Sequence, residues 1–345
     1  MIYDVLVIGA GQAGLAMGYY LKQRNLSFFI LDKGSEMGGS WKNRYDSLTL
    51  FTPNSHSSLP GLSLKGEQDH YPTKDEISDY LLNYAKAFSL PVKLDTTITR
   101  LDRGADGFVV SSNQGEFRSK HVIVATGPFQ LPNVPDFSKR LSDQVLQLHS
   151  SEYKNSNQLL KGATLVVGGG NSGTQIAVEL SSERDIYLSV GHKLRFLPQD
   201  IGKRSIFWWF DKLGLLKANV NSKIGQTIKN KPDPIFGFEL RSQLKSGRVL
   251  LKPKVISADN VQIFFEDNRN IEVRNVIWST GFKSDYSWID IPSLFNEKGM
   301  PIHIRGVTSI KGLYFLGLPW QYRRGSALLQ GVGNDAEYLF KHIAE

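Results

Sequence analysis

Two glycine-rich turns contain the residues best suited to bind a cofactor. They read Gly9-Ala10-Gly11-Gln12-Ala13-Gly14 and Gly168-Gly169-Gly170-Asn171-Ser172-Gly173. In this spacing the first glycine makes a tight turn, the second lets the backbone approach a pyrophosphate, and the third lets a helix pack closely on a strand. With 32 glycines in 345 residues, chance gives the pattern roughly 0.3 times per chain, so the flanking sequence decides its meaning. The chemistry to expect is dinucleotide binding at the N-terminus of a helix.

The elements around both turns are those that a dinucleotide-binding unit needs. A short apolar run precedes each turn, at 4–8 and at 163–167, and a helical pattern follows it. Continuous apolar runs of this length are typical of buried parallel strands. A second strand follows each helix, at 28–31 and at 186–190, so the chain contains two βαβ starts about 160 residues apart. We therefore predict an α/β protein with two Rossmann-type dinucleotide-binding domains.

The residues after each second strand distinguish the two turns. Asp32 stands 18 residues beyond Gly14, where a carboxylate can bind ribose hydroxyls and would repel a ribose 2′-phosphate. At the matching place in the second unit, His192 and Lys193 occur without an acid, and Arg195 follows. This set favours NADPH, with NADH remaining a usable donor. The alternative is that Lys193 is a solvated loop charge.

Further motifs resemble those of the flavin-containing monooxygenases. Gly38-Gly39-Ser40-Trp41, followed by Asn43 to Leu48, is similar to that family's GGxW segment. Ala125-Thr126-Gly127 and Ser279-Thr280-Gly281 each close an apolar strand and resemble its two links between domains. Leu148-His149-Ser150 with Tyr153 resembles the end of its FxGxxxH(S/T)xxY fingerprint. The resemblance spans nearly the whole chain and implies FAD at the first turn, NAD(P)H at the second, and a flavin hydroperoxide as oxygen donor.

The turns and the resemblance together indicate which residues contact the cofactors. For FAD these are Gly9, Gly11, Gln12, Ala13, Gly14, Asp32, Lys33, Gly39, Ser40, Trp41, Leu48, Ile98, Ala125, Thr126, Gly127, Gly317 and Leu318. For the nicotinamide nucleotide they are Gly168, Gly170, Asn171, Ser172, Gly173, His192, Lys193, Thr280 and Gly281. No catalytic side chain is assigned because the flavin would carry the chemistry. Phe51 and Arg324 are the side chains expected near it.

Three places depart from the family's pattern. Asp143 and Val145 replace the Phe and Gly of the fingerprint. Phe51 stands where the larger enzymes have an Asn near the flavin. Gly317-Leu318 replaces a Gly-Asp pair that usually holds the ribityl chain. These changes indicate a small bacterial-type branch with an altered flavin environment.

The absence of cysteine excludes whole classes of chemistry. With no Cys, the chain can form no disulfide, no thiolate metal site and no redox-active Cys pair, and we expect no metal site. The net charge of +8 comes from scattered basic residues and fits a solvated surface and a polyanionic cofactor better than nucleic-acid binding. No apolar run reaches the ~18–20 residues of a membrane span. The N-terminus begins directly with a strand, so we expect a cytoplasmic protein, with a homodimer left open.

The order of the motifs predicts how the domains are arranged. Residues 1–155 with 285–345 would form the FAD domain, and residues 160–280 an NAD(P)H domain inserted in it. The stretch 128–135, which contains three prolines, is expected to be an irregular connector, and a last strand at 312–317 to return to the first domain. We interpret His149 as a structural or hinge residue beside the connector. The aromatic run at 206–210 is interpreted as a cover over a pocket rather than a membrane anchor.

The predicted function is that of an FAD-dependent, NAD(P)H-consuming monooxygenase. It would use O₂ to oxygenate a small molecule that is a soft nucleophile, such as a sulfide or amine, or a ketone. The first alternative is a flavin reductase or oxidase that passes electrons to another acceptor, such as a quinone or a small iron–sulfur protein, without inserting oxygen. The second is a redox sensor that only binds nucleotides.

Overall fold

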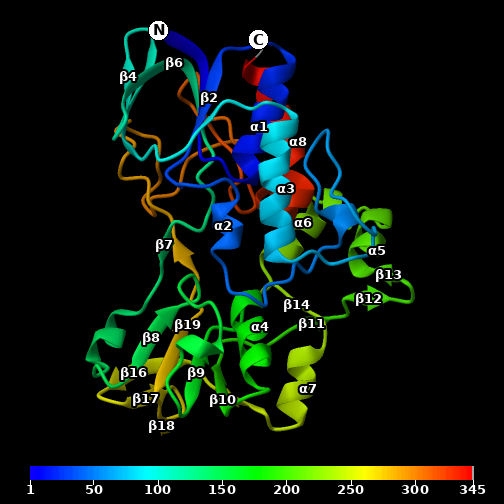
Figure 1. Cartoon of the computed structure of the whole chain (residues 1–345), viewed down its shortest axis with the longest axis vertical. Coiled ribbons are helices and arrows are strands. Elements are labelled where there is room, and N and C mark those ends of the chain that lie inside the picture. Colours follow the sequence, from blue (N-terminus) through cyan, green and yellow to red (C-terminus); the bar gives the residue numbers. More distant parts are fainter. Residues whose placement is uncertain (344–345) are drawn as a thin grey trace.

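Two sheets built on parallel strands lie at opposite ends of the long axis of the molecule (Figure 1). The structure is a computed structural model and describes residues 1–343. The chain crosses between the sheets twice. The two crossings meet where β7 (Leu131–Pro132) pairs antiparallel with β20 (Phe282–Lys283). The stretch at 128–135, predicted to be irregular, therefore contains one short strand.

The first sheet is parallel in the part that follows the Rossmann pattern. Its strand order is β3-β2-β1-β6, and β21 pairs with β6 as well. The bounds are β1 (Ile2–Ile8), β2 (Phe28–Leu31), β3 (Val92–Lys93), β6 (Gly115–Val124) and β21 (Leu313–Phe315). Since β21 pairs in parallel with the last residues of β6, the chain returns to the first sheet as its sequence position predicted. The carboxyl ends of these strands therefore meet at one edge.

The strand β6 also belongs to an antiparallel meander. Its first half pairs with β5 (Gly107–Ser112), which pairs with β4 (Ile98–Gly104). The side chains of β1 alternate between the two faces of the sheet, as expected for a strand with both faces covered. Val5 and Val7 belong to one core cluster and Leu6 to another.

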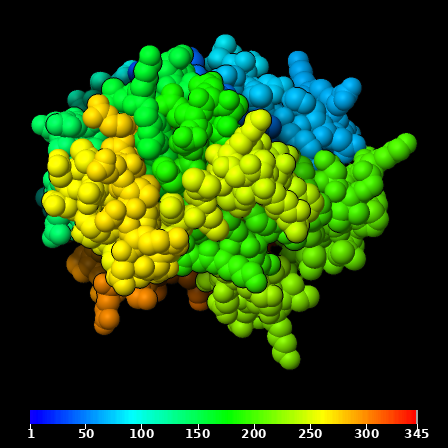
Figure 2. All heavy atoms as spheres, turned by 90° about the horizontal axis from the view of Figure 1, so that it is seen from below, coloured from blue at the N-terminus to red at the C-terminus, as the bar shows by residue number. Residues whose placement is uncertain are grey.

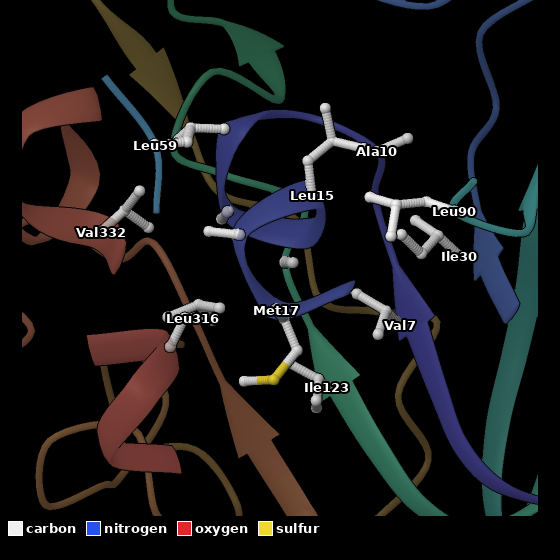
Figure 3. Close-up of a cluster of buried hydrophobic side chains, with 14 of the residues drawn as sticks. Val7, Ala10, Leu15, Met17, Ile30, Leu59, Leu90, Ile123, Leu316 and Val332 are labelled. Carbon is white, nitrogen blue, oxygen red and sulfur yellow. The ribbon is translucent and has the colours of Figure 1, made fainter. Parts of the chain in front are cut away.

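Three helices cover the face of the first sheet to which Val7 belongs. They are α1 (Gln12–Gln23), α3 (Lys74–Ala87) and α8 (Leu329–Ile343). Met17 of α1 lies over Val7 and Ile123, with Leu316 nearby (Figure 3). The meander and residues 286–295 cover the other face. The first turn is therefore held between two packed layers.

The second sheet is parallel throughout, in the order β15-β10-β9-β19-β8. The bounds are β8 (Leu146–His149), β9 (Thr164–Val167), β10 (Ile186–Ser189), β15 (Val249–Lys252) and β19 (Asn275–Trp278). One face packs on α4 (Asn171–Leu180) and α7 (Glu239–Lys245). The other packs on the antiparallel strands β16 (Val255–Asp259), β17 (Gln262–Phe265) and β18 (Asn270–Glu272).

The strand β8 falls inside the range 1–155 that the sequence assigned to the FAD domain, yet it pairs with β19 in the second sheet. The second sheet therefore begins at Leu146 and not near residue 160. The pairing depends on the position of β19, more than 120 residues later in the chain, so local sequence could not indicate it.

The chain between β10 and α7 leaves the second sheet and contains several short elements. They are β11 (Phe196–Leu197), β12 (Asp200–Ile201), β13 (Arg204–Ser205), α5 (Ile206–Lys212), α6 (Lys223–Lys229) and β14 (Ile235–Phe236). The remaining short helix is α2 (Gly39–Lys42). Figure 2 looks onto the second-sheet end, where this part of the chain forms projections at the rim. Within residues 1–343 no helix is long and apolar enough to span a bilayer.

The contact between Gly14 and Gly9 gives a test of the fold. A Cβ atom on Gly14 would lie 1.8 Å from the carbonyl oxygen of Gly9, so Gly14→Ala must move the helix away from the strand. We expect this overpacking to lower the free energy of unfolding by about 2–3 kcal/mol, measured by chemical denaturation of the FAD-free protein. Gly11→Ala is the matched control, because a Cβ there would meet nothing within 4 Å. Equal stability of the two variants would contradict the close contact.

Candidate dinucleotide sites

The first candidate site lies at the carboxyl edge of the first sheet. The turn from Gly9 to Gly14 follows β1, Ala125 follows β6, and Gly317 follows β21 shortly after its end. A Cβ on Gly9 would lie 2.5 Å from the carbonyl oxygen of Ala125, and one on Gly317 would lie 2.9 Å from the Cβ of Ala13. Residues predicted from three separate stretches of sequence are thus brought to the start of α1.

The turn from Gly9 to Gly14 and the start of α1 have the features of a phosphate-binding site, which we call the first cradle. Gly11 caps the helix, and no side chain bonds to its first N–H groups. By contrast, α3 begins with a capping box formed by Thr73 and Glu76. A Cβ on Gly11 would point into open space. Free N–H groups, the partial positive charge of the helix end and this open approach together fit a pyrophosphate.

The carboxylate of Asp32 stabilises the first cradle through hydrogen bonds to the backbone. Its Oδ2 accepts a hydrogen bond from the N–H of Ala10 at 2.6 Å, and its Oδ1 accepts one from the N–H of Gly34 at 2.7 Å. A carboxylate can accept about four hydrogen bonds, so capacity for ribose hydroxyls remains. Asp32 therefore fixes the turn whose backbone would meet the pyrophosphate, a role that the sequence did not indicate.

Gln12 connects three segments around the first site. The indole N–H of Trp41 donates to Oε1 of Gln12 at 3.0 Å, and Nε2 of Gln12 donates to the carbonyl of Ala327 at 3.0 Å. The predicted residues Gln12 and Trp41 thus come together. Ala327 lies just before α8 and was not predicted, because nothing in its own sequence marks a backbone carbonyl as a partner.

For the other residues predicted at the first site, the structure gives exposure and position in the chain but no direct contact with the turn. Lys33 and Ser40 are exposed, and Thr126 and Gly127 follow Ala125 in the link after β6. Leu318 is buried beside Gly317. Ile98 begins β4, close to Thr96, whose N–H donates to the carbonyl of Asp32 at 2.8 Å. Leu48 and Gly39 are half-buried, and Leu48 packs against the cores of both sheets.

The second candidate site repeats the geometry of the first. A Cβ on Gly173 would lie 2.1 Å from the carbonyl oxygen of Gly168, while one on Gly170 would meet nothing within 4 Å. No side chain caps α4, whose first residues are Asn171 and Ser172. The hydroxyl of Ser279 beside this turn is buried and has no hydrogen-bond partner within residues 1–343. These features fit a second pyrophosphate, and we call the turn from Gly168 to Gly173 with the start of α4 the second cradle.

The basic residues at the end of β10 include the predicted ones and one more. His192 and Lys193 are exposed after β10, as a 2′-phosphate site would need. Arg195 is exposed as well, and it donates one hydrogen bond to the carbonyl of Pro232 at 3.0 Å. Lys254, which the sequence did not suggest, lies alongside Gly191, where a Cβ would be 3.4 Å from its Cγ and Cδ. Its proximity follows from the pairing of β15 with β10, which local sequence does not reveal.

The segment from Asn43 to Thr49 connects the first site to the helix of the second. The hydroxyl of Tyr45 donates to Oε1 of Gln175 at 2.7 Å, and Nε2 of Gln175 donates to the carbonyl of Thr49 at 3.0 Å. Burial raises the pKa of Tyr45 to about 12, opposed by hydrogen bonding to Ser172 and by the charge of Arg44. The phenol is therefore neutral and available as a donor at physiological pH.

His149 bonds the second link at Gly281. Its Nε2 lies 3.0 Å from the carbonyl oxygen of Gly281, and its Nδ1 lies 2.8 Å from Oγ of Ser151. Nε2 must carry the proton to bond the carbonyl, and Nδ1 can then accept from Ser151. Burial lowers the pKa of His149, although the bond to Gly281 opposes the shift. These bonds give His149 a structural role. Across from it, Thr280 bonds the carbonyl of Asn133.

Phe51 and Arg324 meet in an aromatic cluster formed with Phe207 and Phe236. Phe51 stacks on Phe236 with ring centroids 4.9 Å apart and on Phe207 at 5.9 Å. The guanidinium of Arg324 lies 5.7 Å from the centre of the Phe236 ring and bonds Asp233. Phe207 comes from the aromatic run at 206–210 and is fully buried, so the inner side of α5 covers the cluster. The outer side leaves Trp209 39% exposed.

The fold and the two cradles define a protein that binds two dinucleotides. The family described as pyridine nucleotide-disulphide oxidoreductase matches residues 6–195, and the chain belongs to this family. The "Uncharacterized oxidoreductase CzcO-like" of Geobacillus kaustophilus is 58% identical over 99% of this chain and 98% of its own length. The "Probable indole-3-pyruvate monooxygenase YUCCA3" of Arabidopsis thaliana is 28% identical, over 98% of this chain and 86% of its own length.

A solved structure with a similar fold supports the same class. The flavin-containing monooxygenase from Stenotrophomonas maltophilia has a TM-score of 0.84 and 26% identity, over 100% of this chain and 99% of that one. The resemblance to flavin-containing monooxygenases is therefore confirmed, as is the α/β fold. The protein is an FAD-dependent oxidoreductase, and its cofactors are FAD and NADPH.

The open space at Gly11 predicts a variant that folds without its flavin. Gly11→Ala puts a methyl group where a pyrophosphate would pass, while the protein loses no contact of its own. We expect normal unfolding of the FAD-free variant but largely apo protein on purification, measured by the ratio of flavin to protein absorbance. Gly170→Ala is the matched control, since it changes the second cradle and should retain FAD. Full flavin content in Gly11→Ala would refute the assignment of the first cradle.

Proposed function

We propose that the protein is an NADPH-consuming monooxygenase that binds FAD at the first cradle and NADPH at the second. The observation that carries the proposal is the presence of two open, uncapped cradles in a chain without cysteine. The cradles fit one flavin dinucleotide and one nicotinamide dinucleotide. Because no thiol pair can relay electrons, a reduced flavin must pass them to O₂ or to an external acceptor.

The charges beside the cradles favour this distribution of cofactors. Asp32 would repel the 2′-phosphate of NADPH at the first site, where FAD has only ribose hydroxyls. Lys193 and Lys254 lie at the second site, where the extra phosphate would need them. The aromatic cluster of Phe51, Phe207 and Phe236, with Arg324 against Phe236, would limit access of water to a substrate bound beside it.

Bound FAD would supply hydride acceptance from NADPH and reaction with O₂. The balanced reaction consumes NADPH, a proton, O₂ and a substrate, and yields NADP⁺, water and the oxygenated substrate. The residues of this chain bind and orient the cofactors and keep the site dry. Phe51 offers no hydrogen-bond donor where the larger enzymes have an Asn, which favours some release of hydrogen peroxide in place of oxygen transfer.

The product formed from a simple sulfide decides between the candidate functions. With purified flavoprotein, NADPH and methyl phenyl sulfide, we expect sulfoxide, and a hydrogen peroxide yield below the NADPH consumed. Peroxide equal to NADPH with no sulfoxide, tested also with an amine and a ketone, would replace the proposal by an oxidase or reductase. No NADPH consumption at all would indicate a nucleotide-binding sensor.

The preference for NADPH should depend on Lys193. One exposed ammonium group that contacts a 2′-phosphate contributes ~1–2 kcal/mol. We therefore expect NADPH to be preferred over NADH by roughly five- to thirtyfold. Lys193→Ala should raise the KM for NADPH and leave that for NADH nearly unchanged. Arg195→Ala is the matched control, because its guanidinium already bonds Pro232. Equal losses with both donors would show that Lys193 only supports the loop, and a wild-type preference for NADH would overturn the assignment.

A further inference from the structure

Arg44 is a half-buried cation between the two links that join the domains. Its guanidinium lies 5.2 Å from the ring centre of Phe129 and 5.6 Å from that of Phe282. Phe129 follows the link that ends at Gly127, and Phe282 follows the link that ends at Gly281. Arg44 thus contacts an aromatic ring from each crossing of the chain.

The guanidinium of Arg44 lacks a polar partner. Within residues 1–343 it makes no hydrogen bond and no carboxylate lies within 4 Å of it. Arg184 and Arg305 are also half-buried, and both donate hydrogen bonds: Arg184 to the carbonyl of Leu160, and Arg305 to the carboxylate of Asp335. Burial lowers the pKa of Arg44, and its charge lowers the pKa values of His149 and Lys154 nearby. An arginine has five N–H donors, and those of Arg44 are free to donate to the oxygens of a ligand.

Three glycines in the two links and in the second turn have open space beside their backbone. A Cβ on Gly127, Gly170 or Gly281 would meet nothing within 4 Å. Tyr45, the next residue, bonds Gln175 on α4, and its pKa is affected by a hydrogen bond from Ser172 in the first turn of that helix. Arg44 is thus the neighbour in sequence of a residue that bonds α4, the helix of the second cradle.

The strand order indicates which part of a nucleotide would pass Arg44. In the order β15-β10-β9-β19-β8, the second cradle follows β9, Lys193 and Lys254 follow β10 and β15, and Phe282 follows β19. A dinucleotide bound at such an edge places its adenosine half toward the second strand and its other half across the switch point, here toward β19. Arg44 contacts Phe282 and so lies on the nicotinamide side.

We propose that Arg44 binds the pyrophosphate of NADPH from the first domain, opposite the N-terminus of α4. The proposal rests on the proposed function, in which the second cradle holds the nicotinamide nucleotide. The planar guanidinium provides two parallel N–H donors that match phosphate oxygens, while the rings of Phe129 and Phe282 hold its plane. Arg44 would connect the domain that binds FAD to the phosphates held by the other domain. It is a positioning residue for the nicotinamide.

The test measures the binding of NADP⁺ and NAD⁺ to the FAD-loaded enzyme by titration calorimetry, without turnover. In Arg44→Met we expect both nucleotides to bind about 10–100-fold more weakly, because the pyrophosphate is common to them. The ratio of the two Kd values should stay as in the wild type, whereas Lys193→Ala should change that ratio. Arg44→Lys should recover part of the affinity, since it keeps the charge but loses the planar fork. Flavin content should be unchanged.

Thermal unfolding of the nucleotide-free protein separates binding from structure. If the role of Arg44 is to bind a phosphate, Arg44→Met removes a charge that has no counterion in the nucleotide-free protein. The Tm should then stay unchanged or rise. A lower Tm with unchanged affinity for both nucleotides would make Arg44 a structural pin between the rings and overturn the proposal. Loss of FAD, or weaker binding of NADP⁺ alone, would also overturn it. Wild-type protein that bound neither nucleotide would instead refute the proposed function of the second cradle.

Discussion

The structure depends on one backbone contact that occurs twice. At the start of α1 and again at the start of α4, the third glycine of the turn lies so close to the carbonyl of the first that any side chain would collide with it. This contact places an uncapped helix end against the carboxyl edge of a parallel sheet. Free N–H groups and open space then coincide at the same point. The rest of each domain, including the apolar layers on both faces of its sheet, keeps strand and helix at this distance.

Transfer of a hydride requires the two sites to face each other, and the contacts between them are mainly polar. Tyr45 and Gln175 connect the segment after the first site to α4, Thr280 bonds the carbonyl of Asn133 where the two crossings meet, and β7 pairs there with β20. Polar contacts of this kind depend on direction, so they fix the orientation of the cradles more than they contribute to stability. Leu48 adds the apolar part, because it packs against the cores of both sheets.

The parts of the molecule that local sequence determines were predictable, and those that depend on sheet order were not. Both turns, their flanking strands and Asp32 follow from spacing alone. The pairing of β8 with β19, the position of Lys254 beside Gly191 and the bond from Gln12 to Ala327 each join residues more than 60 positions apart. The bond of Arg195 to the carbonyl of Pro232 is a further case, because its partner lies 37 positions later in the chain. The resemblance predicts Phe51 and Arg324 near the flavin. It does not predict that both side chains contact Phe236.

The similarity of the two cradles creates a problem of selection that charge can solve. Both offer a pyrophosphate the same backbone geometry, so neither turn can distinguish FAD from NADPH. In the proposed assignment, the carboxylate of Asp32 would disfavour a 2′-phosphate at the first site, while the basic residues after β10 and β15 would favour it at the second. Repulsion at one site and attraction at the other act on the same chemical group, the only phosphate that the two cofactors do not share. A difference of a few side chains at the strand ends would therefore be enough to give two sites of similar backbone geometry opposite preferences.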